Sequence, residues 1–119
     1  MAQSSGSLHE SPEVLAPQTV DRHRAITSLM EELEAVDWYD QRVEAAADAE
    51  LKAILAHNRD EEKEHAAMVL EWLRRRDPAW DKQLRNYLFT EPPILEVEQA
   101  LDAAQAAGDG SLGIGSLRP

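Results

Sequence analysis

The chain has 119 residues, enough for one small domain. It contains no cysteine, which excludes disulfides, iron–sulfur clusters and thiolate zinc sites and leaves oxygen and imidazole as metal ligands. The net charge of -11 argues against nucleic acid or an anionic membrane as partner and suits a surface that gathers cations. Without a signal peptide or a run of roughly 18 apolar residues, we expect a cytoplasmic protein with no membrane span.

Residues 1–18 are rich in Ser, Gly, Pro and Glu and contain only scattered apolar side chains. Such a segment buries too little apolar surface to offset the entropy of ordering it. We therefore expect a flexible N-terminal arm, in which His9 is solvated.

A helical pattern begins near Thr19, a plausible N-cap, and continues to about Ala46 without Gly or Pro. One stripe of this helix steps by four and three residues, and it places a carboxylate, Glu32, among apolar side chains. The members of the stripe are Ala25, Leu29, Glu32, Val36, Tyr39 and Val43.

Asp48 is a reasonable cap for a second helix, which should run to about Arg76, where Asp77 and Pro78 stop it. Its inner stripe has three consecutive polar members, which are costly to bury unless they are paired or bound to a metal. The stripe comprises Leu51, Leu55, Asn58, Glu62, His65, Val69 and Trp72.

The short connection predicts an antiparallel helix hairpin. If the turn centres near Ala47, then Glu32 and Glu62 lie level, because each is 15 residues from it. Glu32, Glu62 and His65 should therefore converge. A short third helix follows Pro78 and completes a helical domain over residues 19–90.

Beyond the domain, residues 91–110 are Ala- and Glu-rich with a thin apolar stripe, and we interpret them as a linker. The last segment, 111–119, alternates glycine with Leu112, Ile114 and Leu117. Three apolar side chains in a flexible peptide indicate either spare disorder or a peptide that docks on another protein, and the regular spacing favours docking.

Glu62 and His65 form a Glu-x-x-His pair on one helical face. Carboxylate-bridged di-metal bundles use two such pairs and a Glu from each of two other helices. One hairpin holds half of that set, and a two-fold dimer would complete it as a four-helix bundle. The ligands suit iron(II), although manganese or zinc would also fit.

Other candidate residues have two open interpretations each. Tyr39 is either a core tyrosine or a side chain that reaches the metal site across the dimer interface. A second set on another face of the helix is either a solvated acidic surface or a weak transit site for cations. That set comprises His57, Glu61 and Glu64. Glu31 and Glu34, doubled by the dimer, could form an acidic mouth beside the buried site.

Four features of the sequence occur together: Glu32 with D-W-Y-D at 37–40, H-N-R-D-E-E-K-E-H at 57–65, W-L-R-R at 72–75 and the terminal S-L-G-I-G-S-L. In this combination the chain closely resembles encapsulated ferritins. The resemblance implies a ring-shaped decamer of five dimers and a terminal peptide that docks cargo inside an encapsulin nanocompartment. It also implies a ferroxidase centre with two iron ions per dimer interface, on Glu32, Glu62 and His65 of two chains with Tyr39 close by. Metal would enter at Glu31 and Glu34, with a further outer site on His57, Glu61 and Glu64.

The sequence thus predicts an all-α ferroxidase that oxidises iron(II) to iron(III) at a site formed only in the dimer. Two other classes of function stay open. One is a metal-free cargo or oligomerisation module, in which the inner polar residues only set the register of the helices. The other is a di-iron peroxidase in the manner of rubrerythrins.

Overall fold

The computed structural model describes residues 7–112, with side chains to residue 108, and every regular element in this range is helical. The elements are η1 (Pro12–Val14), α2 (Pro17–Ala45), α3 (Ala49–Arg76), α4 (Pro78–Tyr87) and α5 (Ile94–Leu112). They form two compact units that divide after Arg76. The all-α prediction is therefore confirmed. None of the helices in the described range is long and apolar enough to cross a membrane.

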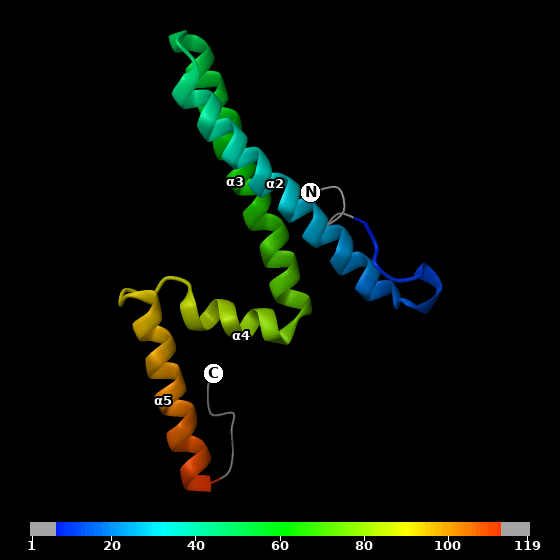
Figure 1. The fold of residues 1–119 in the computed structure, drawn as a ribbon, viewed down its shortest axis with the longest axis vertical. Coiled ribbons are helices and arrows are strands. Elements are labelled where there is room, and N and C mark those ends of the chain that lie inside the picture. Colours follow the sequence, from blue (N-terminus) through cyan, green and yellow to red (C-terminus); the bar gives the residue numbers. More distant parts are fainter. Residues whose placement is uncertain (1–6, 113–119) are drawn as a thin grey trace. The chain divides into compact units, whose positions relative to one another are not determined.

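The first unit contains the predicted antiparallel hairpin of α2 and α3 (Figure 1). Its connection spans only residues 46–48, centred on Ala47 as expected. The Asp48 carboxylate caps α3 by accepting a hydrogen bond from the Leu51 amide at 2.8 Å. The helices lie side by side near this connection and separate toward their other ends (Figure 1).

Helix α2 begins two residues before the predicted start, and Thr19 is not its N-cap. The cap position is Ala16, whose carbonyl accepts from the Thr19 and Val20 amides at 3.0 and 3.2 Å. Pro17 occupies the first turn, where its fixed φ is favourable and its missing N–H has no consequence. The Thr19 hydroxyl instead accepts from the Arg22 guanidinium at 3.2 Å.

The predicted stripes are the less exposed faces of the two helices. All six members of the α2 stripe are partly buried, and so are six of the seven on α3, Leu51 being the exception. Glu32 thus shares a partly buried stripe with Val36, and Glu62 and His65 share theirs with Val69. Helical periodicity alone located this inner face correctly.

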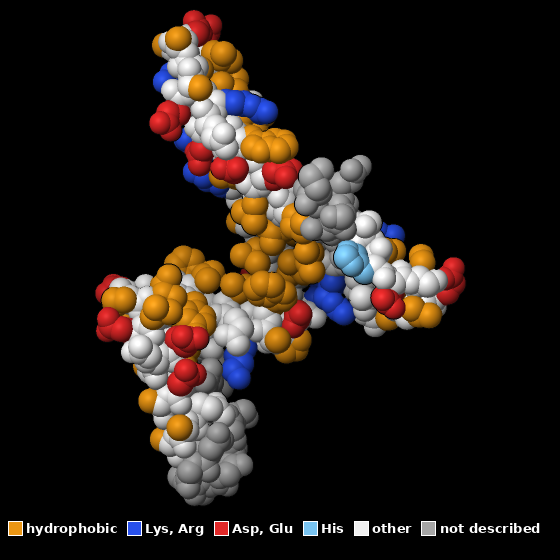
Figure 2. Space-filling model, viewed as in Figure 1, with side chains coloured by type: hydrophobic (Ala, Val, Ile, Leu, Met, Phe, Trp, Pro, Cys, Tyr) orange, Lys and Arg blue, Asp and Glu red, His pale blue; other side chains and the backbone are white. Residues whose placement is uncertain are grey.

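A single hairpin nevertheless leaves much apolar surface exposed to solvent. Among the described residues only Ala66 and Leu73 are buried. Hydrophobic side chains gather over the middle of the hairpin in Figure 2. Six large ones on α2 and α3 are between 41% and 59% exposed: Ile26, Leu33, Trp38, Leu51, Ile54 and Met68. Contiguous apolar surface of this kind marks an interaction site.

The second unit starts with the predicted cap, because the Asp77 carboxylate accepts from the Ala79 and Trp80 amides at 3.0 and 3.3 Å. The corner after α4 contains Phe89, which is fully exposed and has a φ of 61°. This left-handed conformation is unusual for a bulky side chain. The Thr90 hydroxyl stabilises the corner by donating to the Tyr87 carbonyl at 2.8 Å.

Residues 94–112, which include most of the predicted linker and the first two residues of the predicted docking peptide, form α5. The Pro93 carbonyl starts this helix by accepting from the Glu96 and Val97 amides at 2.9 and 3.1 Å. Alanine-rich sequence has high intrinsic helix propensity, which compensates for the thin apolar stripe. The start of the predicted arm (1–6) and Ile114 and Leu117 of the predicted docking peptide lie outside the described residues.

Candidate metal centre

The Glu62–His65 pair of α3 forms the core of the candidate site. One helical turn separates the two residues, and the His65 Nδ1 atom lies 3.0 Å from Glu62 Oε1. The Glu62 side chain is 25% exposed and that of His65 is 43% exposed. A carboxylate that hydrogen-bonds one imidazole nitrogen fixes the ring orientation and leaves Nε2 available for a further interaction.

Glu32 faces this pair from α2. Its Oε2 atom is buried and has no hydrogen-bond partner. Burial raises the pKa of the Glu32 carboxyl above its ordinary value of 4.5, the charge of His65 opposes this rise, and Glu62 and Glu31 add to it. The charges of His65 and Glu62 both act on the Glu32 carboxyl, which indicates that Glu32 lies near the level of this pair.

The arrangement has the chemistry of an incomplete metal site. A buried carboxylate oxygen without a partner is unfavourable in a core, whereas a cation would satisfy it. Oxygen and imidazole donors together suit iron, manganese or zinc. Within the part of one chain that the structure describes, however, no three His, Asp or Glu side chains are grouped closely enough to hold a metal ion.

Tyr39 lies on the predicted inner face, two turns along α2 from Glu32, and is partly buried. The Arg42 guanidinium stands over its ring, 5.4 Å from the centroid. A cation–π contact of this kind holds the ring in place. A role for Tyr39 at the metal site stays a prediction.

Of the predicted outer set on α3, which comprises His57, Glu61 and Glu64, the structure shows a contact between the first two. His57 Nε2 lies 3.1 Å from Glu61 Oε1, and these side chains are 70% and 46% exposed. Glu64 is also exposed, and it lines a hollow of about 510 Å³ that includes Met68 and Trp72. Of the two residues of the predicted acidic mouth, Glu31 is exposed and Glu34 is partly buried.

An ion pair that the sequence did not predict connects the two helices near the site. The Arg59 guanidinium bridges the two helices to Asp40 at 3.1 Å and also pairs with Asp60 at 3.2 Å. Arg59 lies 12 residues after Ala47 and Asp40 lies 7 residues before it, so equal spacing from the turn did not indicate this contact. The pair connects α2 and α3 between the turn and the site.

A helix hairpin with a carboxylate on one helix facing a Glu-x-x-His pair on the other is half of a ferritin-like bundle. The sequence profile of the EncFtn-like family matches residues 7–91. The chain therefore belongs to the EncFtn-like family, which confirms the resemblance found in the sequence.

Relatives support the same assignment along nearly the whole chain. The chain is 66% identical to an encapsulated ferritin-like protein of Rhodospirillum rubrum, over 99% of this chain and 92% of the relative. It is 51% identical to a ferritin-like protein of Thermotoga maritima, over 92% of this chain and 96% of that protein. A crystal structure of a Nitrosomonas europaea protein matches with a TM-score of 0.72 and 67% identity, covering 74% of this chain and 97% of that one.

We predict that Glu32→Leu stabilises the metal-free protein at pH 7, because it removes a buried carboxylate oxygen that lacks a partner. The expected gain in the free energy of unfolding is on the order of 1 kcal/mol. Since the pKa of Glu32 is raised in the folded state, its charged form destabilises the fold above the ordinary pKa of 4.5. The gain should therefore shrink as the pH falls toward 4.5, because Glu32 takes up its proton in the folded protein above that pH.

The measurement is urea unfolding with a chelator present, at one fixed chain concentration. Glu31→Leu is the matched control, because Glu31 is the exposed neighbour of Glu32 and its replacement should change stability by less than about 0.5 kcal/mol. Equal or lower stability of Glu32→Leu at pH 7 would contradict the prediction.

Proposed function

We propose that this protein is a ferroxidase, which oxidises iron(II) to iron(III) at a two-iron site between two chains. The observation that carries the proposal is the buried, unpartnered Oε2 atom of Glu32 facing the Glu62–His65 pair. Iron is the substrate here. Each iron(II) gives up one electron, so two neighbouring ions match a two-electron reduction of dioxygen.

The site requires a second copy of the chain. One hairpin supplies three donors, and a two-fold axis beside them would supply six, because the same patch then faces itself. Glu32 and Glu62 of the two chains would bridge and anchor the ions, and each His65 would bind one ion terminally. The exposed apolar residues of the hairpin, such as Ile26, Leu33 and Ile54, would be covered by the same contact.

The remaining residues would act around this centre. Tyr39 would lie close to the ions across the interface rather than within its own chain, because two turns of helix separate it from Glu32. Glu31 and Glu34 would attract iron(II) toward the site. The pair of His57 and Glu61, with Glu64 on the same helix, would hold cations weakly on the outer surface.

We predict that Glu62→Ala abolishes rapid iron(II) oxidation while the helical fold is retained. Loss of a ligand should slow oxidation by more than the roughly 10- to 100-fold that loss of an outer-shell partner costs. The measurement is the absorbance of iron(III) after iron(II) is mixed with aerated buffer, with circular dichroism as a check on folding. Glu61→Ala is the matched control, because Glu61 is the exposed neighbour on the same helix.

Two further measurements separate the ferroxidase from the other classes. Stoichiometric iron(II) binding under anaerobic conditions, lost in Glu62→Ala, would exclude a purely structural module. Faster oxidation with hydrogen peroxide than with dioxygen would indicate a rubrerythrin-like peroxidase instead. An unchanged oxidation rate in Glu62→Ala would exclude the proposed centre altogether.

Assembly should depend on iron, because the metal ions join donors from two chains. We predict that iron(II) raises the population of dimers and of the ring-shaped decamer relative to the metal-free protein. Native mass spectrometry or light scattering, with and without iron(II) under anaerobic conditions, measures this shift. In His65→Ala the shift should be lost, whereas a His57→Ala control should retain it.

We also propose that the C-terminal peptide, through Leu112, Ile114 and Leu117, docks the protein inside an encapsulin shell. The resemblance of the terminal motif and the name of the Rhodospirillum rubrum relative support this. Removal of residues 111–119 should abolish copurification with a coexpressed encapsulin shell and leave the oxidation rate unchanged. Retained copurification after this truncation would contradict the docking proposal.

A further inference from the structure

The open end of the hairpin carries a charge opposite to that of the whole chain. This end, opposite the connection, comprises the first turns of α2 (residues 18–24) and the last turns of α3 (residues 71–76). These ranges contain two carboxylates, Asp21 and Glu71, and five arginines: Arg22, Arg24, Arg74, Arg75 and Arg76. The chain as a whole has 23 acidic and 12 basic residues. Positive charge is therefore concentrated in one place on an acidic protein.

Both carboxylates of this end are already engaged. Asp21 pairs with Arg24 at 2.7 Å. Glu71 accepts from Arg74 at 2.7 Å and from Arg75 at 2.6 Å, which lowers the pKa of its carboxyl to about 2. Neither carboxylate is left to neutralise the other two arginines.

Arg22 and Arg76 have no carboxylate partner among the described side chains. The Arg22 guanidinium donates to the Thr19 hydroxyl at 3.2 Å, and the Arg76 guanidinium stacks over the Trp72 ring, 4.1 Å from its centroid. Arginines near the end of α3 are favourable for the helix dipole, but this does not account for Arg22 at the start of α2. In a chain with excess carboxylates, two unpaired arginines in one place indicate a site for an anion from outside.

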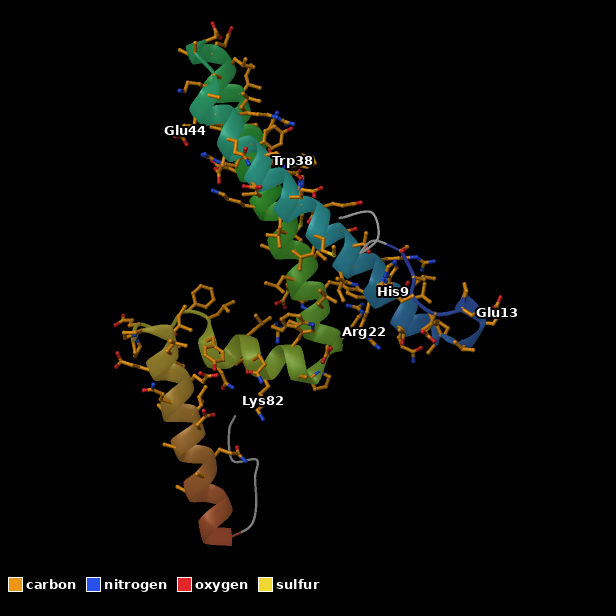
Figure 3. The ribbon with its side chains drawn as sticks, in the orientation of Figure 1. His9, Glu13, Arg22, Trp38, Glu44 and Lys82 are labelled. Carbon is orange, nitrogen blue, oxygen red and sulfur yellow. The ribbon has the colours of Figure 1, made fainter. Side chains whose placement is uncertain are left out.

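The two arginines line the same hollow. It measures about 290 Å³ and is lined by Gln18, Asp21, Arg22, Trp72 and Arg76. Figure 3 labels Arg22 on α2, near the C-terminal end of α3. At about 30 Å³ per water molecule, the hollow has room for one or two hydrated phosphate groups. Each guanidinium can donate two parallel hydrogen bonds to a phosphate, and the Gln18 amide adds a neutral donor.

We propose that this hollow binds a phosphate-type oxyanion between Arg22 and Arg76. Asp21 also lines the hollow, but its carboxylate is paired with Arg24, which partly neutralises its charge toward the anion. Trp72 holds the Arg76 guanidinium in place and so limits the entropy lost when the anion binds. None of these residues belongs to the proposed iron centre, so the site is independent of the ferroxidase function.

Isothermal titration calorimetry of the full-length protein with inorganic phosphate, and separately with pyrophosphate, tests the proposal. Arg22→Gln and Arg76→Gln should each weaken binding at least tenfold. Arg85→Gln is the matched control, because Arg85 is an ion-paired arginine in the second unit, and it should leave the affinity unchanged. Affinity should also fall as sodium chloride is raised, because the interaction is ionic.

A second measurement does not depend on how the variants fold. In the unaltered protein, phosphate should shift the amide resonances of residues 18–24 and 71–76 before those of other residues. The proposal is overturned if millimolar phosphate and pyrophosphate do not bind, if Arg85→Gln weakens binding as much as Arg22→Gln, or if acetate binds as tightly as phosphate.

Discussion

The stability of the hairpin and the chemistry of its inner face both depend on the burial of one carboxylate, that of Glu32. Glu32 is held on the inner face of α2, where its Oε2 atom has no partner and burial raises the pKa of its carboxyl. An unsatisfied charge in such a position is expected to cost on the order of 1–3 kcal/mol in a single chain. The charge of His65 offsets this cost only in part, and the charge of Glu62 adds to it. A second chain and bound cations would remove the remaining cost.

The same constraint links stability, assembly and chemistry. The described part of the chain buries only Ala66 and Leu73, so the hairpin gains little from its own core and leaves large apolar side chains exposed. Small domains with limited burial depend on association for stability. If the covering partner also supplies metal ligands, then the folded assembly and the reactive site form together.

The sequence predicted the hairpin, its turn and the level of Glu32, because helical periodicity and equal spacing from Ala47 are local properties of the chain. It did not predict that α2 starts at Pro17, since Thr19 is a preferred N-cap residue type and Ala16, the observed cap, is not. It indicated a linker over residues 91–110, and α5 forms there because helix propensity outweighs a weak apolar pattern. The Arg59–Asp40 contact and the unpaired Arg22 and Arg76 depend on side-chain positions, which periodicity does not specify.

The Arg59–Asp40 ion pair restricts how far one helix can slide along the other. Two long helices joined by a three-residue connection could slide, and one turn of α-helix corresponds to about 5.4 Å. A slip of that size would set Glu32 beside Asn58 or Ala66 instead of the Glu62–His65 pair. Because Arg59 reaches across to Asp40 between the turn and the site, the pair opposes this movement. An exposed ion pair, which adds little to stability, can still hold a buried site in register.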